Sequence, residues 1–334
     1  MKKIVVSGER FFMKFGASSF LRYFDERAKE ADAVIVEDRD GDEGSFASKA
    51  REASAVVVIG RKVGPEVIRG LERCEIILAL SVGYDCIDVA AATGRGIPVC
   101  HLPAYCTDDV ASHAMALLLT LTRKIPLFVS QLRKGRWDYN IGKPLHNYRG
   151  KILGIVGLGR IGRAVVPKAK GFGMEVSAYD PYLDDDIFDG LGVQRRYELD
   201  DLLRESDFIT IHAPLTGETL RMIDGRAIGL LKPHAVLVNT ARGEILDEAA
   251  LYEALREMRI GGAGLDVVDN EPFTPDNPLY SLDNAVVTPH VAWYSEESFR
   301  NSMAQSMDEV VGVLNGHRPR SIVNPEVLWK GGRG

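Results

Sequence analysis

Residues 151–162 read KILGIVGLGRIG, and the prediction of the fold starts from them. A short apolar run is followed by three glycines, Gly157, Gly159 and Gly162, in GxGxxG spacing. In such a sequence the first glycine permits a tight turn and the second lets the backbone approach a pyrophosphate. The third allows a helix to pack closely on the strand, and that helix offers free N–H groups to the anion. Any glycine-rich turn can match the bare pattern, so the flanking sequence has to agree.

The flanking sequence does agree with a dinucleotide site. A second apolar run ends at Asp180, where an acid is expected to accept hydrogen bonds from the adenosine ribose. The same carboxylate repels a 2′-phosphate, and no arginine follows it immediately, so NAD is favoured over NADP as the cofactor. We expect Arg160 and Ile161, which open the helix, to complete the cofactor loop.

Short β-branched runs alternate with helical stretches along the chain, which predicts parallel sheets covered on both faces. In the first hundred residues the expected strands are 3–6, 33–36, 55–59, 75–81 and 97–100, with helices such as 18–30 and 65–73. From residue 151 onward they are 151–156, 174–179, 207–212, 235–239, 261–266 and 285–288, with helices such as 199–205 and 247–257. Six strands with intervening helices are what a complete doubly wound nucleotide-binding domain needs.

Two helices flank this second block, one long helix expected over 107–134 and another over 295–316. The simplest topology therefore inserts a Rossmann NAD domain (107–294) into a flavodoxin-like substrate domain (1–106 and 295–334). The helix at 107–134, capped by Thr107, is apolar all round at its centre and is expected to be deeply buried. Together with the long aromatic loop at 135–150 it predicts a homodimer, although both could pack within one subunit.

The overall composition excludes several functions. The net charge of −6 and the isoelectric point near 5.7 argue against a nucleic-acid or anionic-membrane partner. No run of 18 apolar residues or signal-peptide pattern occurs, so we expect no membrane span and a cytoplasmic protein. The four cysteines lack CxxC spacing, which predicts reduced, mostly buried thiols and no metal site.

Polar residues recur just past the expected strands of the second block. The segments are VNTARGEILDE (238–248), AGLDVVDNEP (263–272) and VVTPHVAWYSEES (286–298). With SVGYDCID (81–88) and HAPLTGET (212–219), they resemble the signature segments of the D-isomer-specific 2-hydroxyacid dehydrogenases, in an order that covers nearly the whole chain. Around HVAWYSEES and YDPYL the sequence is most similar to the C-terminal-binding-protein branch, whose members include transcriptional corepressors.

The resemblance implies a role for each matching residue. Arg242 would bind the substrate carboxylate, His290 would be the acid/base, and Glu271 would pair with His290. A second group of residues would bind the cofactor, namely His212, Thr240, Ala241 and Asp266. Among them, Asp266 and the backbone near Ala241 would hold the nicotinamide carboxamide. Backbone N–H groups at Val82 and Gly83 would also hold the substrate carboxylate, and Trp293 would wall the substrate side chain. His113 is expected to be structural, and Ser112 stands where the family often has an acid.

The chemistry independently requires such parts. To hold a 2-oxo acid in place, the protein has to bind its carboxylate. The guanidinium group of an arginine does so through two parallel hydrogen bonds. As hydride reaches the carbonyl carbon, the oxygen needs a proton, which an imidazolium supplies near neutral pH. A carboxylate on the other ring nitrogen fixes the tautomer and stabilises the imidazolium, and a closed cleft between domains supplies orientation.

The expected function is therefore an NAD-dependent D-2-hydroxyacid dehydrogenase acting on a small 2-oxo or 2-hydroxy acid. A D-3-phosphoglycerate dehydrogenase shares every motif, and a corepressor-like protein could use NAD as a conformational ligand. A formate dehydrogenase typically has Gln where Glu271 stands. Trp293 favours a moderately bulky apolar substrate, whereas Arg61 and Lys62, which follow an expected strand, would favour a phosphate.

Overall fold

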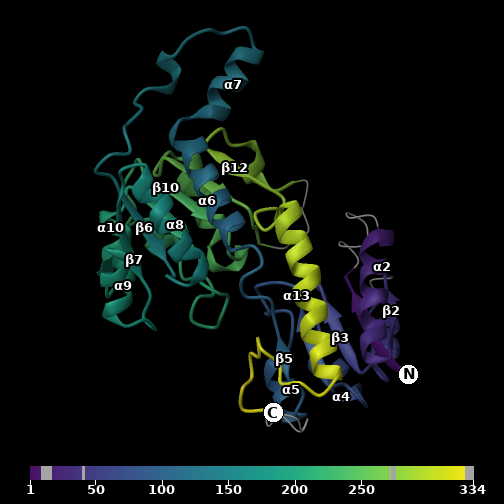
Figure 1. Cartoon of the computed structure of the whole chain (residues 1–334). Coiled ribbons are helices and arrows are strands. Elements are labelled where there is room, and N and C mark those ends of the chain that lie inside the picture. Colours follow the sequence, from purple (N-terminus) through teal and green to yellow (C-terminus); the bar gives the residue numbers. More distant parts are fainter. Residues whose placement is uncertain (9–16, 40–41, 270, 272–275, 328–334) are drawn as a thin grey trace. The chain divides into compact units, whose positions relative to one another are not determined.

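The computed structural model describes residues 1–8, 17–39, 42–269, 271 and 276–327. The chain forms two compact units (Figure 1). The terminal unit consists of Met1–Tyr105 and Ser295–Gly334, and the inserted unit is Cys106–Tyr294. Each contains one sheet in which every strand pair is parallel. The expected α/β class with two parallel sheets is confirmed.

The terminal unit has the strand order β2-β1-β3-β4-β5, the flavodoxin-like arrangement. Its strands are β1 Lys2–Ser7, β2 Ala33–Asp38, β3 Ala55–Val58, β4 Ile76–Ala79 and β5 Val99–Cys100. Its helices are α2 Ala17–Ala28, η1 Lys29–Ala31, α3 Glu43–Ala50, α4 Pro65–Gly70, α5 Val89–Gly94 and α13 Glu296–Leu314. β3 and β4 are buried along their whole length, as expected for strands covered on both faces.

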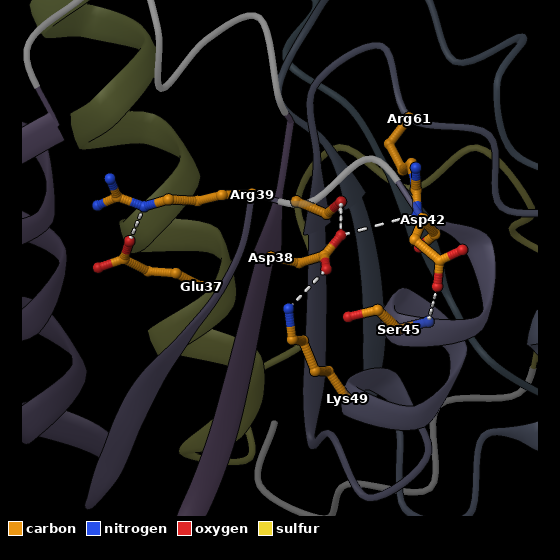
Figure 2. A network of polar contacts seen from close by, with 8 residues as sticks. Glu37, Asp38, Arg39, Asp42, Ser45, Lys49 and Arg61 are labelled. Carbon is orange, nitrogen blue, oxygen red and sulfur yellow. Dashed lines mark hydrogen bonds and ion pairs between the residues drawn. The ribbon is translucent and has the colours of Figure 1, made fainter.

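A buried polar network lies where β1 and β2 end (Figure 2). The Asp38 carboxylate, which is 1% exposed, accepts hydrogen bonds from Ser7 Oγ (2.7 Å) and Lys49 Nζ (2.9 Å). Arg61, just after β3, lies 3.8 Å from the same carboxylate and donates to the Asp42 carbonyl (2.7 Å). The network therefore joins three strand ends to helix α3.

The inserted unit has the strand order β12-β11-β10-β9-β6-β7-β8. Its strands are β6 Ile152–Val156, β7 Glu175–Tyr179, β8 Gln194–Arg196, β9 Phe208–Ile211, β10 Val236–Asn239, β11 Gly262–Leu265 and β12 Ala285–Val287. Six of them were expected and β8 was not. Its sequence is QRR, and an edge strand without an apolar run gives no hydrophobic signal.

Helices cover both faces of this sheet, and alternate residues of β10 show the two sides. Val236 and Val238 belong to one core cluster, with α6 and α8, whereas Leu237 belongs to the other. The helices are α6 Thr107–Thr122, α7 Ile125–Arg133, η2 Asn140–Gly142, α8 Arg160–Gly171, α9 Asp185–Leu191, α10 Leu199–Glu205, α11 Gly225–Ile228, η3 Gly243–Ile245, α12 Glu248–Arg256 and η4 Pro278–Ser281.

The single helix expected over 107–134 is wrong, because α6 and α7 are separate and meet at 57°. Lys124 between them has a left-handed backbone (φ 50°), and Pro126 has no N–H to continue the helical hydrogen bonds. The capping residue is Cys106 and not Thr107. Most of the centre of α6 is buried as expected, but none of the residues of α7 is.

Across the part of the chain that the structure describes, no single helix is long and apolar enough to cross a membrane. The bent pair α6 and α7 passes the same test together, by length and composition only.

Candidate active site

The glycine loop between β6 and α8 has the geometry that its sequence predicts. Gly157 has φ 88°, and a Cβ there would lie 2.8 Å from the Ala213 amide nitrogen. A Cβ on Gly162 would lie 2.3 Å from the Gly157 carbonyl oxygen, so only glycine allows this close packing. At Gly159 no atom lies within 4 Å of the corresponding position. The loop is therefore packed on two sides and open where an anion would approach the N-terminus of α8.

Arg160 and Ile161 form the first turn of α8. Arg160 is exposed, whereas Ile161 is half-buried and packs on the core beneath the loop. Both positions agree with a loop whose backbone faces a ligand, and their role in cofactor binding stays a prediction.

Asp180, at the end of β7, is held beside the glycine loop. Its Oδ2 accepts the Leu158 N–H (2.9 Å) and its Oδ1 accepts the Tyr182 N–H (3.1 Å). Each carboxylate oxygen can accept two hydrogen bonds, so each retains acceptor capacity for a ribose hydroxyl.

Two further predicted cofactor residues follow β9 and β10. Burial lowers the pKa of His212 to about 3, so its imidazole is neutral, and its Nε2 lies 2.9 Å from Thr210 Oγ1. The Thr240 hydroxyl is buried and has no hydrogen-bond partner among the residues in view. A buried unpaired hydroxyl is unfavourable unless a ligand or water satisfies it. These residues, with the open glycine loop and Asp180, fit a dinucleotide.

The backbone around Ala241 is partly used inside the chain. The Ala241 N–H donates to Asn239 Oδ1 (2.9 Å), and its carbonyl accepts from Arg242 Nη1 (2.7 Å). Arg242 is thus anchored at one nitrogen to its own turn. A Cβ on Gly243 would lie 2.1 Å from the Val268 carbonyl carbon, so glycine at this position lets the Arg242 turn pack against the backbone that follows β11.

Glu271 and His290 form a hydrogen-bonded pair on the loops that follow β11 and β12. The distance from His290 Nδ1 to Glu271 Oε2 is 2.7 Å. The His290 side chain is 43% exposed and that of Glu271 is 26% exposed. Burial alone would raise the pKa of Glu271, but His290, the Val268 N–H and the charge of Arg242 together hold it below its usual value. Nε2 of His290 makes no hydrogen bond with any residue whose position is described.

Asp266 holds the turn that carries His290, whose backbone has φ 50°. Its Oδ1 accepts from Thr288 Oγ1 (2.6 Å) and the Val291 N–H (2.9 Å), and its Oδ2 accepts from the Ala292 N–H (2.8 Å). Its carbonyl accepts the His290 N–H (2.8 Å). Asp266 is 1% exposed, so its contacts here are those of a positioning residue. The role in nicotinamide binding implied by the sequence stays a prediction.

His113 on α6 reaches the same turn. Its Nε2 lies 3.0 Å from Thr288 Oγ1 and 3.6 Å from Asp266 Oδ1. Because the Thr288 hydroxyl donates its hydrogen to Asp266, His113 must be the donor in this contact. The contact supports the structural role expected for His113, and the neighbouring Ser112 is exposed.

Trp293 is fixed on the His290 turn. Its indole Nε1 donates to the His290 carbonyl (3.0 Å), and its ring meets Tyr294 edge-on at 5.5 Å. The side chain is half-buried, and its contact with a substrate stays a prediction.

In the terminal unit, the carbonyl groups of Val82 and Gly83 accept hydrogen bonds from side chains of the same unit. The Val82 carbonyl oxygen lies 2.8 Å from His101 Nδ1, and the Gly83 carbonyl accepts from Ser81 Oγ (2.6 Å). His101 therefore helps to hold this loop. Of the two candidate phosphate contacts, Lys62 is exposed, whereas Arg61 belongs to the Asp38 network (Figure 2).

The four cysteines are free thiols, two of them buried and two half-buried. Burial raises the pKa of Cys74 to about 12, so its thiol is unreactive. Among the residues that the structure describes, no three His, Cys, Asp or Glu side chains are grouped to hold a metal ion.

Comparison with known proteins places this geometry in a family. Residues 115–292 match the model of the D-isomer specific 2-hydroxyacid dehydrogenase NAD binding domain. A glyoxylate reductase of Korarchaeum cryptofilum is 40% identical over 285 residues, covering 84% of this chain and 85% of that protein. A D-3-phosphoglycerate dehydrogenase of Methanocaldococcus jannaschii is 41% identical over 83% of this chain, which spans 52% of that longer relative.

A solved structure shows the same architecture. The D-lactate dehydrogenase of Aquifex aeolicus, complexed with NAD and lactic acid, aligns with a TM-score of 0.83 and 28% identity over 94% of this chain and 96% of that one. The fold, the family model and these relatives thus define an NAD-binding oxidoreductase that acts on the CH–OH group of 2-hydroxy acids. The chain belongs to the D-isomer specific 2-hydroxyacid dehydrogenase family.

Proposed function

We propose that this protein reversibly transfers hydride between NAD and the 2-carbon of a small 2-oxo or 2-hydroxy acid, with His290 as the acid/base. The observation that carries the proposal is the 2.7 Å pair of His290 Nδ1 and Glu271. The pair leaves Nε2 of an exposed imidazole for the substrate oxygen, and it lies on the sheet that also carries the open glycine loop.

Each side chain has one task in this reaction. Bound NADH supplies the hydride for reduction. Arg242 binds the substrate carboxylate, together with backbone N–H groups at Val82 and Gly83. His290 gives its Nε2 proton to the substrate oxygen as that oxygen gains charge, and takes it back in the oxidation direction. Glu271 keeps the ring in the required tautomer and stabilises its charge, while Asp266 fixes the turn from which His290 projects.

The substrate side chain is proposed to be uncharged and moderately bulky. Trp293 offers an apolar ring beside His290, and burial of apolar surface against it contributes about 25 cal/mol per Å². Arg61 is held by Asp38 and the Asp42 carbonyl, so its position favours a structural role over phosphate binding. Lys62 remains as a contact that would favour phosphohydroxypyruvate, the substrate that the serine-pathway alternative requires.

An NADH-oxidation screen tests the proposal. The substrates are glyoxylate, hydroxypyruvate, pyruvate, phenylpyruvate, 4-methylthio-2-oxobutyrate and phosphohydroxypyruvate. We expect the apolar 2-oxo acids to give the highest kcat/KM and glyoxylate a modest one. If phosphohydroxypyruvate is best and Trp293→Ala leaves it unchanged, the apolar preference is wrong. No turnover of any 2-oxo acid would favour a corepressor-like protein that only binds NAD.

Preference for NAD over NADP is proposed to come from Asp180. Its carboxylate is fixed by two backbone N–H groups beside the glycine loop, where it would meet a 2′-phosphate with like charge. Equal kcat/KM with NADH and NADPH would contradict this preference. Asp180→Ala should reduce the ratio of kcat/KM for NADH to that for NADPH, mainly by lowering the affinity for NADH.

We further propose a cytoplasmic homodimer built on α7. Ile125, Val129 and Leu132 share one face of this helix and are 48%, 40% and 50% exposed. Figure 1 shows α7 and the loop after it extending away from the sheet of the inserted unit, and that loop exposes Trp137 (91%) and Tyr139 (73%). Light scattering should report a dimer at micromolar concentration, and Leu132→Glu should weaken it.

A further inference from the structure

Glu248, the first residue of α12, has both carboxylate oxygens engaged in holding another loop. Its Oε2 accepts the backbone N–H of Asp269 (2.8 Å), and its Oε1 accepts from the side-chain Nδ2 of Asn277 (2.6 Å). Asp269 and Asn277 lie on either side of Glu271 in the sequence. One carboxylate thus ties together the two ends of the segment that carries the partner of His290.

We propose that Glu248 is a positioning residue for the Glu271–His290 pair, an inference that rests on the proposed function of that pair. Glu271 must keep its carboxylate at hydrogen-bonding distance from an imidazole on a different loop. The His290 turn is fixed by Asp266, and the start of the Glu271 segment packs on Gly243. Glu248 supplies the corresponding fixed point on the Glu271 side, at both ends of the segment.

The donors and acceptors explain why this residue must be a carboxylate. Asn277 Oδ1 accepts the Leu279 N–H (3.0 Å) at the start of η4, so its Nδ2 faces Glu248 as a donor. The Asp269 N–H is a second donor. Two donors require two acceptor oxygens, and a glutamine in place of Glu248 has only one. Its NH₂ group would then face a donor, and one of the two hydrogen bonds would be lost.

The same geometry supplies a test by exchange. Glu248→Gln places an NH₂ group opposite another donor. Asn277→Asp places a carboxylate opposite the carboxylate of Glu248. In the double variant Glu248→Gln/Asn277→Asp, the amide at position 248 donates to the carboxylate at position 277. Its oxygen still accepts the Asp269 N–H, so both hydrogen bonds re-form. Asn277→Asp also retains the acceptor for Leu279. Glu253→Gln, on the same helix but in an exposed ion pair with Arg256, is the matched control.

Each variant is assayed for 2-oxo acid reduction across pH, for NADH affinity by fluorescence, and for thermal stability. We expect each single variant to lower kcat by about 10- to 100-fold, the effect of a misplaced catalytic group, with NADH affinity unchanged. The basic limb of the kcat/KM profile should move to lower pH, because the imidazolium loses its carboxylate partner. The double variant should recover kcat to within about 3-fold of the parent protein, with the parent pH profile, since both hydrogen bonds return.

Two results would overturn the inference. The first is a single variant that loses thermal stability but keeps the parent kcat and pH profile. The second is a folded double variant that remains as slow as the single ones. Both differ from failure of the proposed function, in which His290→Ala and Glu271→Gln would themselves leave turnover unchanged.

Discussion

Both units carry polar side chains at or just after the carboxyl ends of parallel strands, yet these side chains are used in opposite ways. In the terminal unit, the Asp38 carboxylate accepts from Ser7 and is paired with Arg61 and with Lys49 of helix α3. Figure 2 shows the two cations on this carboxylate. The Asp38 carboxylate is 1% exposed and is balanced by Arg61 and Lys49. In the inserted unit, Asp266 and Glu271 use their hydrogen bonds to hold His290, whose side chain stays 43% exposed.

The comparison shows that position at a strand end does not by itself leave a side chain available to a ligand. What separates the two groups is whether the hydrogen bonds end within the network or leave one side-chain atom without a hydrogen bond to a described residue, here His290 Nε2. Arg61 and Arg242 make the same point. Arg61 lies over the Phe46 ring (4.8 Å) and beside Asp38, whereas Arg242 projects from a turn packed against the Glu271 segment.

The largest expected effect comes from removing the reactive atom. His290→Ala should lower kcat by about 10²- to 10⁴-fold, the usual range for loss of a general acid. NADH affinity by fluorescence titration should be nearly unchanged, because the glycine loop and Asp180 are untouched. A variant that kept most of its turnover would show that His290 is not the acid.

Exchanging each arginine for lysine sharpens the comparison. Arg242→Lys should lower kcat/KM by about 10- to 100-fold through both KM and kcat, since an ammonium cannot grip a planar carboxylate with two parallel bonds. Arg61→Lys should leave KM unchanged, because that guanidinium serves the terminal unit. Steady-state kinetics of the two variants test which arginine contacts the substrate. A raised KM in Arg61→Lys would place Arg61 in the substrate site.

Removing the charge at the centre of the terminal network should affect stability and not chemistry. Asp38→Asn leaves Lys49 and Arg61 facing one another without a counter-charge, which should destabilise the protein by about 1–3 kcal/mol. Hydrogen exchange should locate the loosening at the ends of β1 and β2. A large fall in kcat at unchanged Tm would contradict the structural role of this network.

A pH dependence of the free energy of unfolding is expected from His212. Its folded pKa of about 3 lies below its ordinary value of 6.5, so the unfolded chain binds the proton first as pH falls. Stability is therefore fully present above pH 6.5 and is lost progressively toward pH 3, by about 2 kcal/mol between pH 6.5 and 5. His212→Gln should flatten urea-unfolding stability over this interval. An unchanged slope would mean that other groups cause it.

Asp207 also contributes to the pH dependence of stability, but in a lower pH range than His212. Burial alone would raise its pKa, but His234, the Ile152 N–H and Lys232 lower it to about 2. Its contribution is present above its ordinary value of 3.8 and is lost only as pH falls through about 2.

Local patterns were sufficient to predict the fold class. The apolar runs predicted all the strands except β8, whose QRR sequence has no apolar residue. The glycine spacing predicted a loop whose conformation and packing indeed require Gly157 and Gly162. The break between α6 and α7 was missed although Pro126 signals it, because the apolar pattern continues across the break.

Two parallel sheets, and an arginine, an acid and a histidine past strand ends, could be predicted from the amino-acid sequence, because apolar periodicity and residue type are local properties. Which polar groups bind one another within the protein became clear only from the folded chain. Asp38 is the last residue of β2 and Asp266 directly follows β11, and both are 1% exposed, but one closes a network with Arg61 and the other fixes the His290 turn. Hydrogen bonds between residues far apart in the chain depend on distances that exist only once the strands have paired.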